Sequence, residues 1–270
     1  MSETDKVFAG TIPDVYDDYL VPLIFETYAV DLARRVASLE PKSVLETAAG
    51  SGVVTRELAP LLTEDARYSV TDLNQPMLDR AFIRQPADAR IEWQQADALN
   101  LPFQEETFDV ICCQFGVMFF PDKVAGYRSA LRTLHDGGKF IFNVWDRIEE
   151  NEFADSVTRT ASAIYPDDPP LFLARTPHGY HDVALIEAEL KAAGFLDFEV
   201  HTIASDSRAG NPRIPAVAYC QGTPLRNELE ARDPSSIEDV TNRAAADLEL
   251  RYGSGPVSGK IQGHVIIATK

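Results

Sequence analysis

The alternation of strand and helix patterns that begins at residue 43 is the feature that most limits how this chain can fold. Short β-rich segments are followed, one after another, by segments with helical periodicity. One strand segment, 108–113, is apolar except for Asp109, which is typical of a strand covered on both faces. Because such an alternation folds through right-handed βαβ crossovers, the sequence predicts an α/β fold around a doubly wound, parallel sheet.

The predicted elements can be placed along the chain by their patterns. Strands are predicted at 43–47, 67–71, 91–95, 108–113, 139–145, 197–203 and 260–269. Helices are predicted at 53–62, 74–84, 123–134, 183–193, 214–232 and 235–252. The helix at 123–134 is expected to stop at the turn 135–138, because glycine suits a helix C-terminus.

Two long segments depart from this alternation and are candidates for covering structures. Residues 1–40 are predicted to be helical, and residues 146–183, which contain four prolines, are predicted to be irregular. The insertions in 146–257 follow strands, so they are expected to cover the ligand-binding face as a lid, or to be elaborations of the fold without that role. Residues 41–145 form the expected core, and 258–270 the last strand. The whole chain, 1–270, is predicted to be a single domain.

The charge balance excludes one broad class of partner. The chain has 270 residues, with 42 acidic against 25 basic side chains and a net charge of −17. Binding to a phosphate backbone depends on clustered Lys and Arg, so a nucleic-acid partner is not expected. The first residues show no secretory signal, and no run of about 20 apolar residues is present to span a bilayer. We therefore expect a cytoplasmic protein with no membrane partner.

The cysteines give no sign of a disulfide framework or a zinc site. There are three of them, Cys112, Cys113 and Cys220, and no CxxC motif. Cys112 and Cys113 fall in an apolar strand, where packing in the core is the expected role.

Polar or glycine-containing segments follow four consecutive predicted strands, and they carry the chemistry. They are Glu46–Gly52, Asp72, Asp97 and Gln114–Met118. The carboxyl ends of parallel strands meet at one edge of the sheet, so these segments are expected to line one site. Glycine lets the backbone approach a ligand closely, and a carboxylate at the second strand can accept hydrogen bonds from both ribose hydroxyls. Taken singly, the glycines could form only a tight turn and Asp97 only a helix cap.

Taken together, these residues resemble the class I S-adenosylmethionine-dependent methyltransferases, particularly the small-molecule group called type 11. The resemblance covers residues 43–145. It depends on Val44–Gly52, on Asp72 with Met77 and on Asp97–Phe103, and is supported by Phe108–Val110 and Leu131–Ile141. It implies a seven-stranded, mostly parallel, Rossmann-like sheet with one antiparallel strand and helical cap segments. It also implies S-adenosyl-L-methionine as the cofactor and a small organic molecule as the methyl acceptor.

The resemblance also implies which residues contact the cofactor. The glycine loop would hold its methionine part, Asp72 its ribose, and Asp97 its adenine amino group. The full set of candidates is Glu46, Ala48, Gly50, Gly52, Asp72, Leu73, Met77, Asp97, Ala98, Gln114 and Phe115. The chain departs from the family at Thr47-Ala48-Ala49, where Asp or Gly is common, so no side-chain contact from this stretch to the cofactor amino group is predicted.

Two alternatives stay open at this point. A nicotinamide-dependent oxidoreductase also uses glycines and an acid at the second strand, but its GxGxxG fingerprint is broken here by Thr55. A methyltransferase-like protein could also keep the cofactor pocket without turnover. The sequence leaves open whether the chain is a monomer or a homodimer.

No catalytic residue is identified with certainty by the sequence, because a sulfonium methyl donor is already activated. Tyr16 and Tyr19 are candidates for a gate over the donor, or for packing on the core. His178 and His181 are candidates for a general base, or for a surface loop pair. Their spacing lacks a third ligand, so no metal site is predicted.

Overall fold

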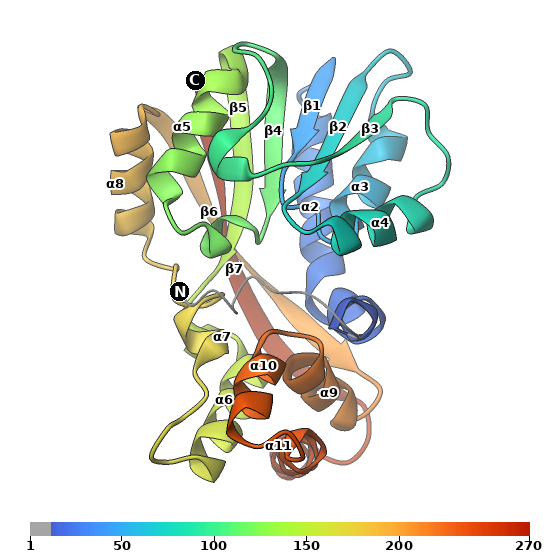
Figure 1. Ribbon diagram of the computed structural model, residues 1–270, viewed down its shortest axis with the longest axis vertical. Coiled ribbons are helices and arrows are strands. Elements are labelled where there is room, and N and C mark those ends of the chain that lie inside the picture. Colours follow the sequence, from blue (N-terminus) through green and yellow to red (C-terminus); the bar gives the residue numbers. More distant parts are fainter. Residues whose placement is uncertain (1–11) are drawn as a thin grey trace. The chain divides into compact units, whose positions relative to one another are not determined.

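The computed structural model describes residues 12–270, and the first eleven residues of the expected N-terminal cap lie outside the described residues. It contains one seven-stranded sheet with the order β3-β2-β1-β4-β5-β7-β6 (Figure 1). The strands are β1 Ser43–Glu46, β2 Arg67–Asp72, β3 Ile91–Gln95, β4 Phe108–Gln114, β5 Leu134–Trp145, β6 Asp197–Ala209 and β7 Val257–Thr269. The predicted α/β class and the seven strands are confirmed.

The pairing of the strands confirms a mostly parallel sheet with an antiparallel member. The pairs β1–β2, β1–β4, β2–β3 and β4–β5 are parallel. Lys270 N donates to Gly138 O over 2.9 Å, whereas Asp146 N donates to Gln262 O over 3.0 Å. The partner number falls from 270 to 262 as β5 advances, so β7 runs antiparallel to β5.

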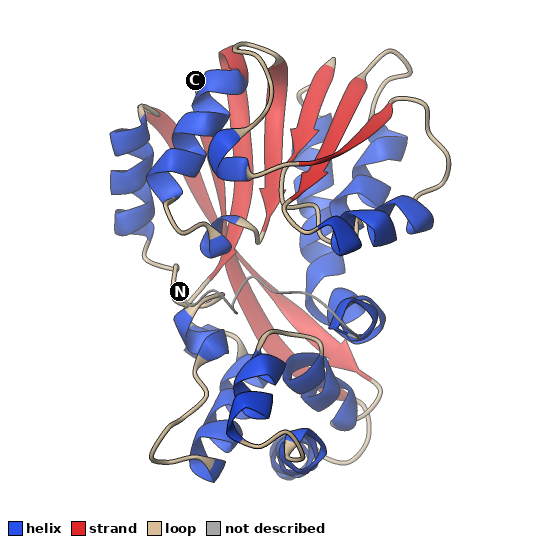
Figure 2. Ribbon diagram, viewed as in Figure 1, coloured by secondary structure: helices blue, strands red, loops and turns tan. Residues whose placement is uncertain are grey.

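Helices fill most of the connections between strands (Figure 2). In order along the chain they are α1 Ile12–Val15, the π-helical η2 Tyr16–Phe25, α2 Glu26–Ala37, α3 Val53–Leu58, η3 Ala59–Leu61, α4 Gln75–Arg84, η4 Ala98–Asn100, η5 Val117–Phe119, α5 Lys123–Thr133, η6 Ile148–Glu150, α6 Glu152–Ile164, α7 Phe172–Arg175, α8 Val183–Ala193, α9 Arg213–Gln221, α10 Leu225–Arg232 and α11 Ile237–Tyr252. Side-chain caps begin two of the α-helices: Asp122 accepts from Ala125 N at α5, and Asp182 accepts from Ala184 N at α8.

The structure corrects several of the predicted elements. Residues 146–183 are not irregular, because helix α6 buries Phe153, Val157 and Ala161 at helical spacing before the prolines begin. Strand β5 starts at Leu134 rather than 139, since the glycines expected to form a turn pair with the chain end. The predicted helix at 214–232 is two helices, α9 and α10.

The contacts divide the chain into two compact units. Unit 1 comprises Met1–Phe25, Trp145–Tyr180 and Ala204–Gly263, and unit 2 comprises Glu26–Val144, His181–Ile203 and His264–Lys270. The strands β5, β6 and β7 contribute residues to both. The organisation of the chain as a single domain stays a prediction. Among residues 12–270, no helix combines the length and the apolar character that crossing a membrane requires.

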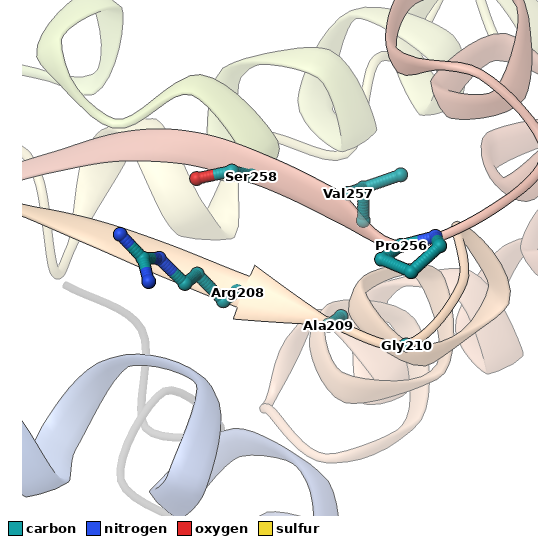
Figure 3. A pocket seen from close by; sticks show the side chains of 6 residues that line it. All are labelled: Arg208, Ala209, Gly210, Pro256, Val257 and Ser258. Atoms are coloured by element: carbon teal, nitrogen blue, oxygen red, sulfur yellow. The ribbon is translucent and has the colours of Figure 1, made fainter.

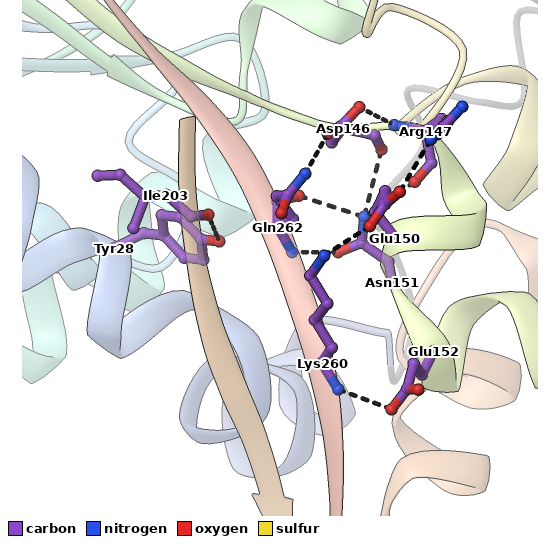
Figure 4. Close-up of polar contacts among 9 residues, drawn as sticks. All are labelled: Tyr28, Asp146, Arg147, Glu150, Asn151, Glu152, Ile203, Lys260 and Gln262. Atoms are coloured by element: carbon purple, nitrogen blue, oxygen red, sulfur yellow. Dashed lines mark hydrogen bonds and ion pairs between the residues drawn. The ribbon is translucent and has the colours of Figure 1, made fainter. Parts of the chain in front are cut away.

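Aromatic packing and buried hydrogen bonds hold unit 2 together. The ring of Tyr127 on α5 lies 6.1 Å from that of Phe140 and 5.4 Å from that of Phe142, both on β5. On α2, Tyr28 is fully buried, and its hydroxyl donates to Ile203 O over 2.9 Å (Figure 4). Burial of such rings supplies much of the driving force for folding this unit.

Unit 1 is a helical cluster that packs on the ends of β6 and β7. Helix α11 contacts α6 and α9, and α9 contacts η2. Ser207 Oγ of β6 donates to Leu23 O of η2 over 2.9 Å. A Cβ at Gly259 of β7 would lie 2.9 Å from the ring of Phe153, so glycine allows α6 to approach the strand closely.

A polar network joins the start of α6 to β7 within unit 1 (Figure 4). Asn151 is buried, and its Nδ2 donates to Arg147 O and Gln262 O, both over 3.2 Å. Its Oδ1 accepts from Gln262 N over 3.1 Å. Lys260 Nζ lies 2.6 Å from Glu150 Oε2, which adds an ion pair at the rim of the network.

We predict that Asn151→Ala lowers the free energy of unfolding by about 2–3 kcal/mol, because Gln262 N loses its side-chain acceptor while Gln262 O and Arg147 O each lose one of their two donors. Urea unfolding followed by circular dichroism measures this change. The matched control is Asn100→Ala, which removes an exposed asparagine and should leave stability within about 0.5 kcal/mol of the parent. Equal effects of the two substitutions would contradict the role given to the network.

Candidate cofactor site

The carboxyl edge of the sheet at β1 is where a ligand is expected to bind. Strand β1 lies between β2 and β4, and the order of the strands reverses at this point. In open α/β sheets, ligands bind outside the carboxyl ends of the strands at such a switch point. The predicted segments after β1, β2, β3 and β4 therefore all lie at this edge of unit 2.

The loop after β1 takes an unusual backbone conformation. Ala48, Gly50 and Gly52 have φ of 52°, 58° and 77°. Ala48 holds the left-handed conformation without being glycine, which costs about 1 kcal/mol. At Gly52 a Cβ would lie 2.9 Å from Ala81 Cβ, so this position requires glycine for both conformation and space. Such strain is typical of loops shaped for a ligand.

Both neighbouring strands hold this loop in place. Thr47 N donates to Cys112 O on β4 over 2.9 Å. Ala49 N donates to Thr71 O on β2 over 3.0 Å. The loop is therefore positioned by the sheet itself and not only by the helix α3 that follows it.

Asp72, at the end of β2, is the best-defined candidate in the site. Its side chain is buried, with 6% of its surface exposed. Oδ2 accepts from Gly50 N over 2.8 Å, and Oδ1 accepts from Asn74 N over 2.7 Å. Burial raises the pKa of Asp72, and the N–H groups of Asn74 and Gly50 oppose that rise. Each carboxylate oxygen has a second lone pair, which suits it to accept from two hydroxyl groups of a ligand.

Asp97 follows β3 and is exposed. Its Oδ1 accepts from Leu99 N over 2.9 Å, which caps the short helix η4. The preceding residue is tied to the site, because Ala96 N donates to Asp72 O over 3.0 Å. The capping role is thus observed, and the contact of Asp97 and the half-buried Ala98 with adenine stays a prediction.

Two apolar candidates, Leu73 and Met77, follow Asp72 in the sequence. Leu73 is 46% exposed, and Met77 is buried on α4. Gln95 Nε2 donates to Leu73 O over 2.8 Å, so the ends of β2 and β3 are joined here as well. An exposed leucine beside a buried carboxylate suits the packing of a flat ring, as predicted for adenine, and that contact stays a prediction.

Glu46 is placed in the interior of unit 2. Its side chain is 1% exposed, and its Oε2 accepts from Thr55 Oγ1 over 2.7 Å and from the hydroxyl of Tyr68. Burial raises the pKa of Glu46 from 4.5 to about 7. These contacts favour a role in positioning the glycine loop against α3 and β2. Direct contact of Glu46 with the cofactor stays a prediction.

The segment after β4 closes the site on the other side of β1. Phe115 has a φ of 50°, and its ring lies edge-on to Tyr28 at 5.2 Å. Gln114 is half-buried and pairs in register with Asn143 of β5. A Cβ at Gly116 would lie 2.5 Å from Ala48 Cβ, so this segment packs directly on the glycine loop. The contacts of Gln114 and Phe115 with the cofactor stay predictions.

Ser51 tests whether the site fits a ligand. Its hydroxyl is buried within the glycine loop and has no hydrogen-bond partner among residues 12–270. A buried polar group without a partner costs about 1–3 kcal/mol, so its presence in this loop indicates a partner that comes with the ligand. Together with the buried carboxylate of Asp72, this hydroxyl fits a polar cofactor such as S-adenosylmethionine.

The four candidate catalytic residues are distributed over both units. Tyr16, Tyr19 and His178 belong to unit 1, and His181 belongs to unit 2. His178 is buried, and its Nδ1 lies 2.9 Å from Asp146 O. A carbonyl can only accept, so Nδ1 carries the hydrogen and Nε2 is the basic nitrogen of the neutral ring.

The roles predicted for these four residues, in a gate and in acid–base chemistry, stay predictions. In the described part of the chain no cluster of His, Cys, Asp or Glu could hold a metal ion.

The cysteines and one surface hollow carry no sign of catalysis. Cys112, Cys113 and Cys220 are free and buried, and burial raises the pKa of Cys113 to about 11, so its thiol stays protonated at neutral pH.

A hollow of about 460 Å³ in unit 1 lies between the end of β6 and the start of β7 (Figure 3). Its lining includes Arg208, which pairs with Asp206 over 2.9 Å. It shares no residue with the candidate cofactor site.

Comparison with known proteins decides the family. The sequence profile of the ubiE/COQ5 methyltransferase family matches residues 10–169, which is more than half of the chain. The chain belongs to this family. Its membership confirms the expected class I methyltransferase fold, methyl transfer as the reaction class and S-adenosylmethionine as the cofactor. It also excludes the nicotinamide-dependent oxidoreductase. Thr55, which stands at the third glycine position of that fingerprint, donates its hydroxyl to Glu46.

Individual relatives are distant. A demethylmenaquinone methyltransferase from Clavibacter sepedonicus is 25% identical over 189 residues, which span 64% of this chain and 74% of that protein. UbiE, the ubiquinone/menaquinone biosynthesis C-methyltransferase of Idiomarina loihiensis, is 28% identical over 163 residues, 56% of this chain and 59% of that protein.

Among solved structures, phosphoethanolamine N-methyltransferase 2 of Haemonchus contortus, in complex with S-adenosyl-L-methionine, is similar in fold. It has a TM-score of 0.62 and 16% identity, and the match covers 100% of this chain and 60% of that one.

The predicted segments Glu46–Gly52 and Gln114–Met118 contain Ser51 and Gly116 without singling them out, and sequence reasoning missed Asn143. Gly116 and Asn143 carried a signal that could have found them. Gly116 is the glycine after β4, and Asn143 is the one amide in the otherwise apolar end of β5. Ser51 gave no such signal, because serine is common in glycine-rich turns.

The buried position of Glu46 predicts a pH dependence of stability. The unfolded carboxyl titrates near 4.5 and the folded one near 7, so between these values the folded state binds more protons than the unfolded state. The free energy of unfolding should therefore fall as pH rises from about 4.5 to 7, by an amount on the order of 3 kcal/mol from this group. Glu46→Gln removes the titration and should flatten this part of the profile.

Denaturant unfolding at a series of pH values measures the effect. The matched control is Glu92→Gln, an exposed glutamate of β3, which should leave the profile parallel to that of the parent. A profile for Glu46→Gln that keeps the parent's slope between pH 4.5 and 7 would rule out the assignment.

Proposed function

We propose that this chain transfers the methyl group of S-adenosylmethionine to a small organic acceptor, with the cofactor bound at the carboxyl ends of β1, β2, β3 and β4. The observation that carries this placement is Asp72. Its buried carboxylate receives N–H groups on both oxygens, one of them from Gly50 of the glycine loop. This arrangement joins a ribose acceptor to a loop shaped for the methionine part.

Each candidate residue has a distinct task in this proposal. Asp72 accepts from the ribose hydroxyls, and the backbone of Ala48, Gly50 and Gly52 leaves room for the methionine part. Leu73 and Met77 pack against adenine, and Asp97 with Ala98 contacts the adenine amino group. Glu46 holds the loop from behind. Gln114 and Phe115 line the floor beneath the reactive end.

The chemistry supplied by the cofactor is a methyl group already activated on a sulfonium sulfur. The chain's own residues therefore need to hold the cofactor, orient the acceptor in line and exclude water. An amine acceptor needs only its neutral form, whereas an oxygen or carbon acceptor must first lose a proton. The sequence-based candidates for taking that proton are His178 and His181, and those for a gate are Tyr16 and Tyr19.

The acceptor is proposed to be a small molecule. The net charge of −17 disfavours a nucleic acid, and the relatives from Clavibacter and Idiomarina are named as a demethylmenaquinone methyltransferase and a ubiquinone/menaquinone biosynthesis C-methyltransferase. A demethylated naphthoquinol is therefore the first acceptor to test, within a panel that also contains phenols and amines. Placement in the cytoplasm is part of the same proposal.

Calorimetry tests the cofactor site directly. The parent chain should bind S-adenosylmethionine and S-adenosylhomocysteine and should not bind NADH. Asp72→Asn should lower the binding affinity for both adenosyl ligands about 10-fold or more, because a carboxylate that accepts two hydrogen bonds from the ligand is lost. The matched control is Asp79→Asn, an exposed aspartate of α4, which should leave affinity unchanged.

Thermal unfolding of both variants shows whether they remain folded. Unchanged affinity in a folded Asp72→Asn variant, or binding of NADH alone, would overturn the proposed site.

A further inference from the structure

Asn143 is a polar residue in a strand segment that is otherwise apolar. It lies two residues before the end of β5 and is fully buried. Its neighbour Phe142 contacts Tyr127 of α5. Because side chains alternate along a strand, Asn143 points to the other face of the sheet, away from α5.

The orientation of the Asn143 carboxamide is fixed by one hydrogen bond. Its Oδ1 accepts from Phe115 N over 3.1 Å, an N–H that also donates to Asn143 O over 3.1 Å, and Phe115 is the first residue after β4. An N–H group can only donate, so the atom facing it must be the oxygen, and the amide cannot be flipped. The carboxamide therefore leans toward the carboxyl edge of the sheet between β4 and β5.

The other half of this carboxamide has no hydrogen-bond partner in the part of the chain that the structure describes. Nδ2 is buried, and no acceptor within residues 12–270 lies within hydrogen-bond reach of it. Leaving a buried donor unpaired costs about 1–3 kcal/mol, so native structures rarely keep one without a reason. The strained φ of Phe115 beside it is a second sign that this corner is shaped for a ligand.

The position of this donor relates it to the methionine end of the cofactor site. The residue after Phe115 is Gly116, whose missing Cβ would lie 2.5 Å from Ala48 Cβ. The segment that Asn143 holds is thus packed on the glycine loop, the part of the site assigned to the methionine moiety. Ser51, another buried donor without a partner among residues 12–270, lies in the same loop.

We propose that Asn143 is a cofactor-binding residue, whose Nδ2 donates to the carboxylate of the methionine moiety of S-adenosylmethionine. A carboxylate brought into a buried site needs donors, and hydrogen bonds to a charged acceptor are stronger than neutral ones. A neutral amide supplies such a donor without placing a positive charge beside the sulfonium. This inference rests on the cofactor placement proposed above.

The test compares two ligands that differ only in the carboxylate. Calorimetry is carried out with S-adenosylmethionine and with decarboxylated S-adenosylmethionine, on the parent chain and on Asn143→Asp. The variant keeps the acceptor for Phe115 N and loses the donor. Its affinity for S-adenosylmethionine should fall about 10-fold or more, since the lost hydrogen bond is to a charged group. Its affinity for the decarboxylated ligand should stay equal or rise.

Asn143→Ala provides a second variant without an added charge, and thermal unfolding shows that each variant is folded. The Asn143→Ala variant should also lose affinity for S-adenosylmethionine and keep its affinity for the decarboxylated ligand. An equal loss for both ligands, or no loss for either, would overturn the inference.

Asp72→Asn separates the two proposals, because both ligands contain the ribose. If Asp72→Asn lowers the affinity for both ligands and the Asn143 variants lower the affinity for neither, the proposed site stands and the role of Asn143 is wrong. If Asp72→Asn lowers the affinity for neither ligand, the proposed site itself is wrong.

Discussion

The hydrogen bond from Gly50 N to the buried carboxylate of Asp72 is the contact on which the site depends. It joins the end of β2 to the loop after β1 across the sheet edge. Burial raises the pKa of Asp72, and the N–H groups of Gly50 and Asn74 oppose that rise by replacing part of the water that the carboxylate loses. The left-handed backbone of Gly50 accompanies this contact, since the loop turns Gly50 N toward that carboxylate.

Other buried polar groups support the loops at the carboxyl edge of the sheet. Glu46 connects β1 to Thr55 of α3 and Tyr68 of β2, and Asn143 holds the segment after β4. Such supporting contacts fix the geometry of a binding loop more tightly than the loop could by itself. The fold alone does not determine the acceptor, because the same sheet hosts many methyl acceptors, and specificity is carried by residues that line each individual site.

The sequence predicted the sheet, because its strands are short apolar segments separated by helical ones. It also located Asp72, Asp97 and the glycine loop, since strand ends in a parallel sheet share one edge. It could not show that Asp97 caps η4 or that Glu46 is buried, because both facts depend on neighbours distant in sequence. The helix α6 was missed because nearby prolines dominated the local pattern, although they follow the helix.

The most direct test of this account is a crystal structure of the chain with S-adenosylhomocysteine. The account predicts that the ribose hydroxyls lie within hydrogen-bond distance of Asp72, with the homocysteine part against Ala48 and Gly50. Because Gly50 N and Asn74 N already hold the carboxylate, Asp72 should move little on binding. Density for the ligand away from the carboxyl ends of β1 and β2, or a ribose without contact to Asp72, would contradict it.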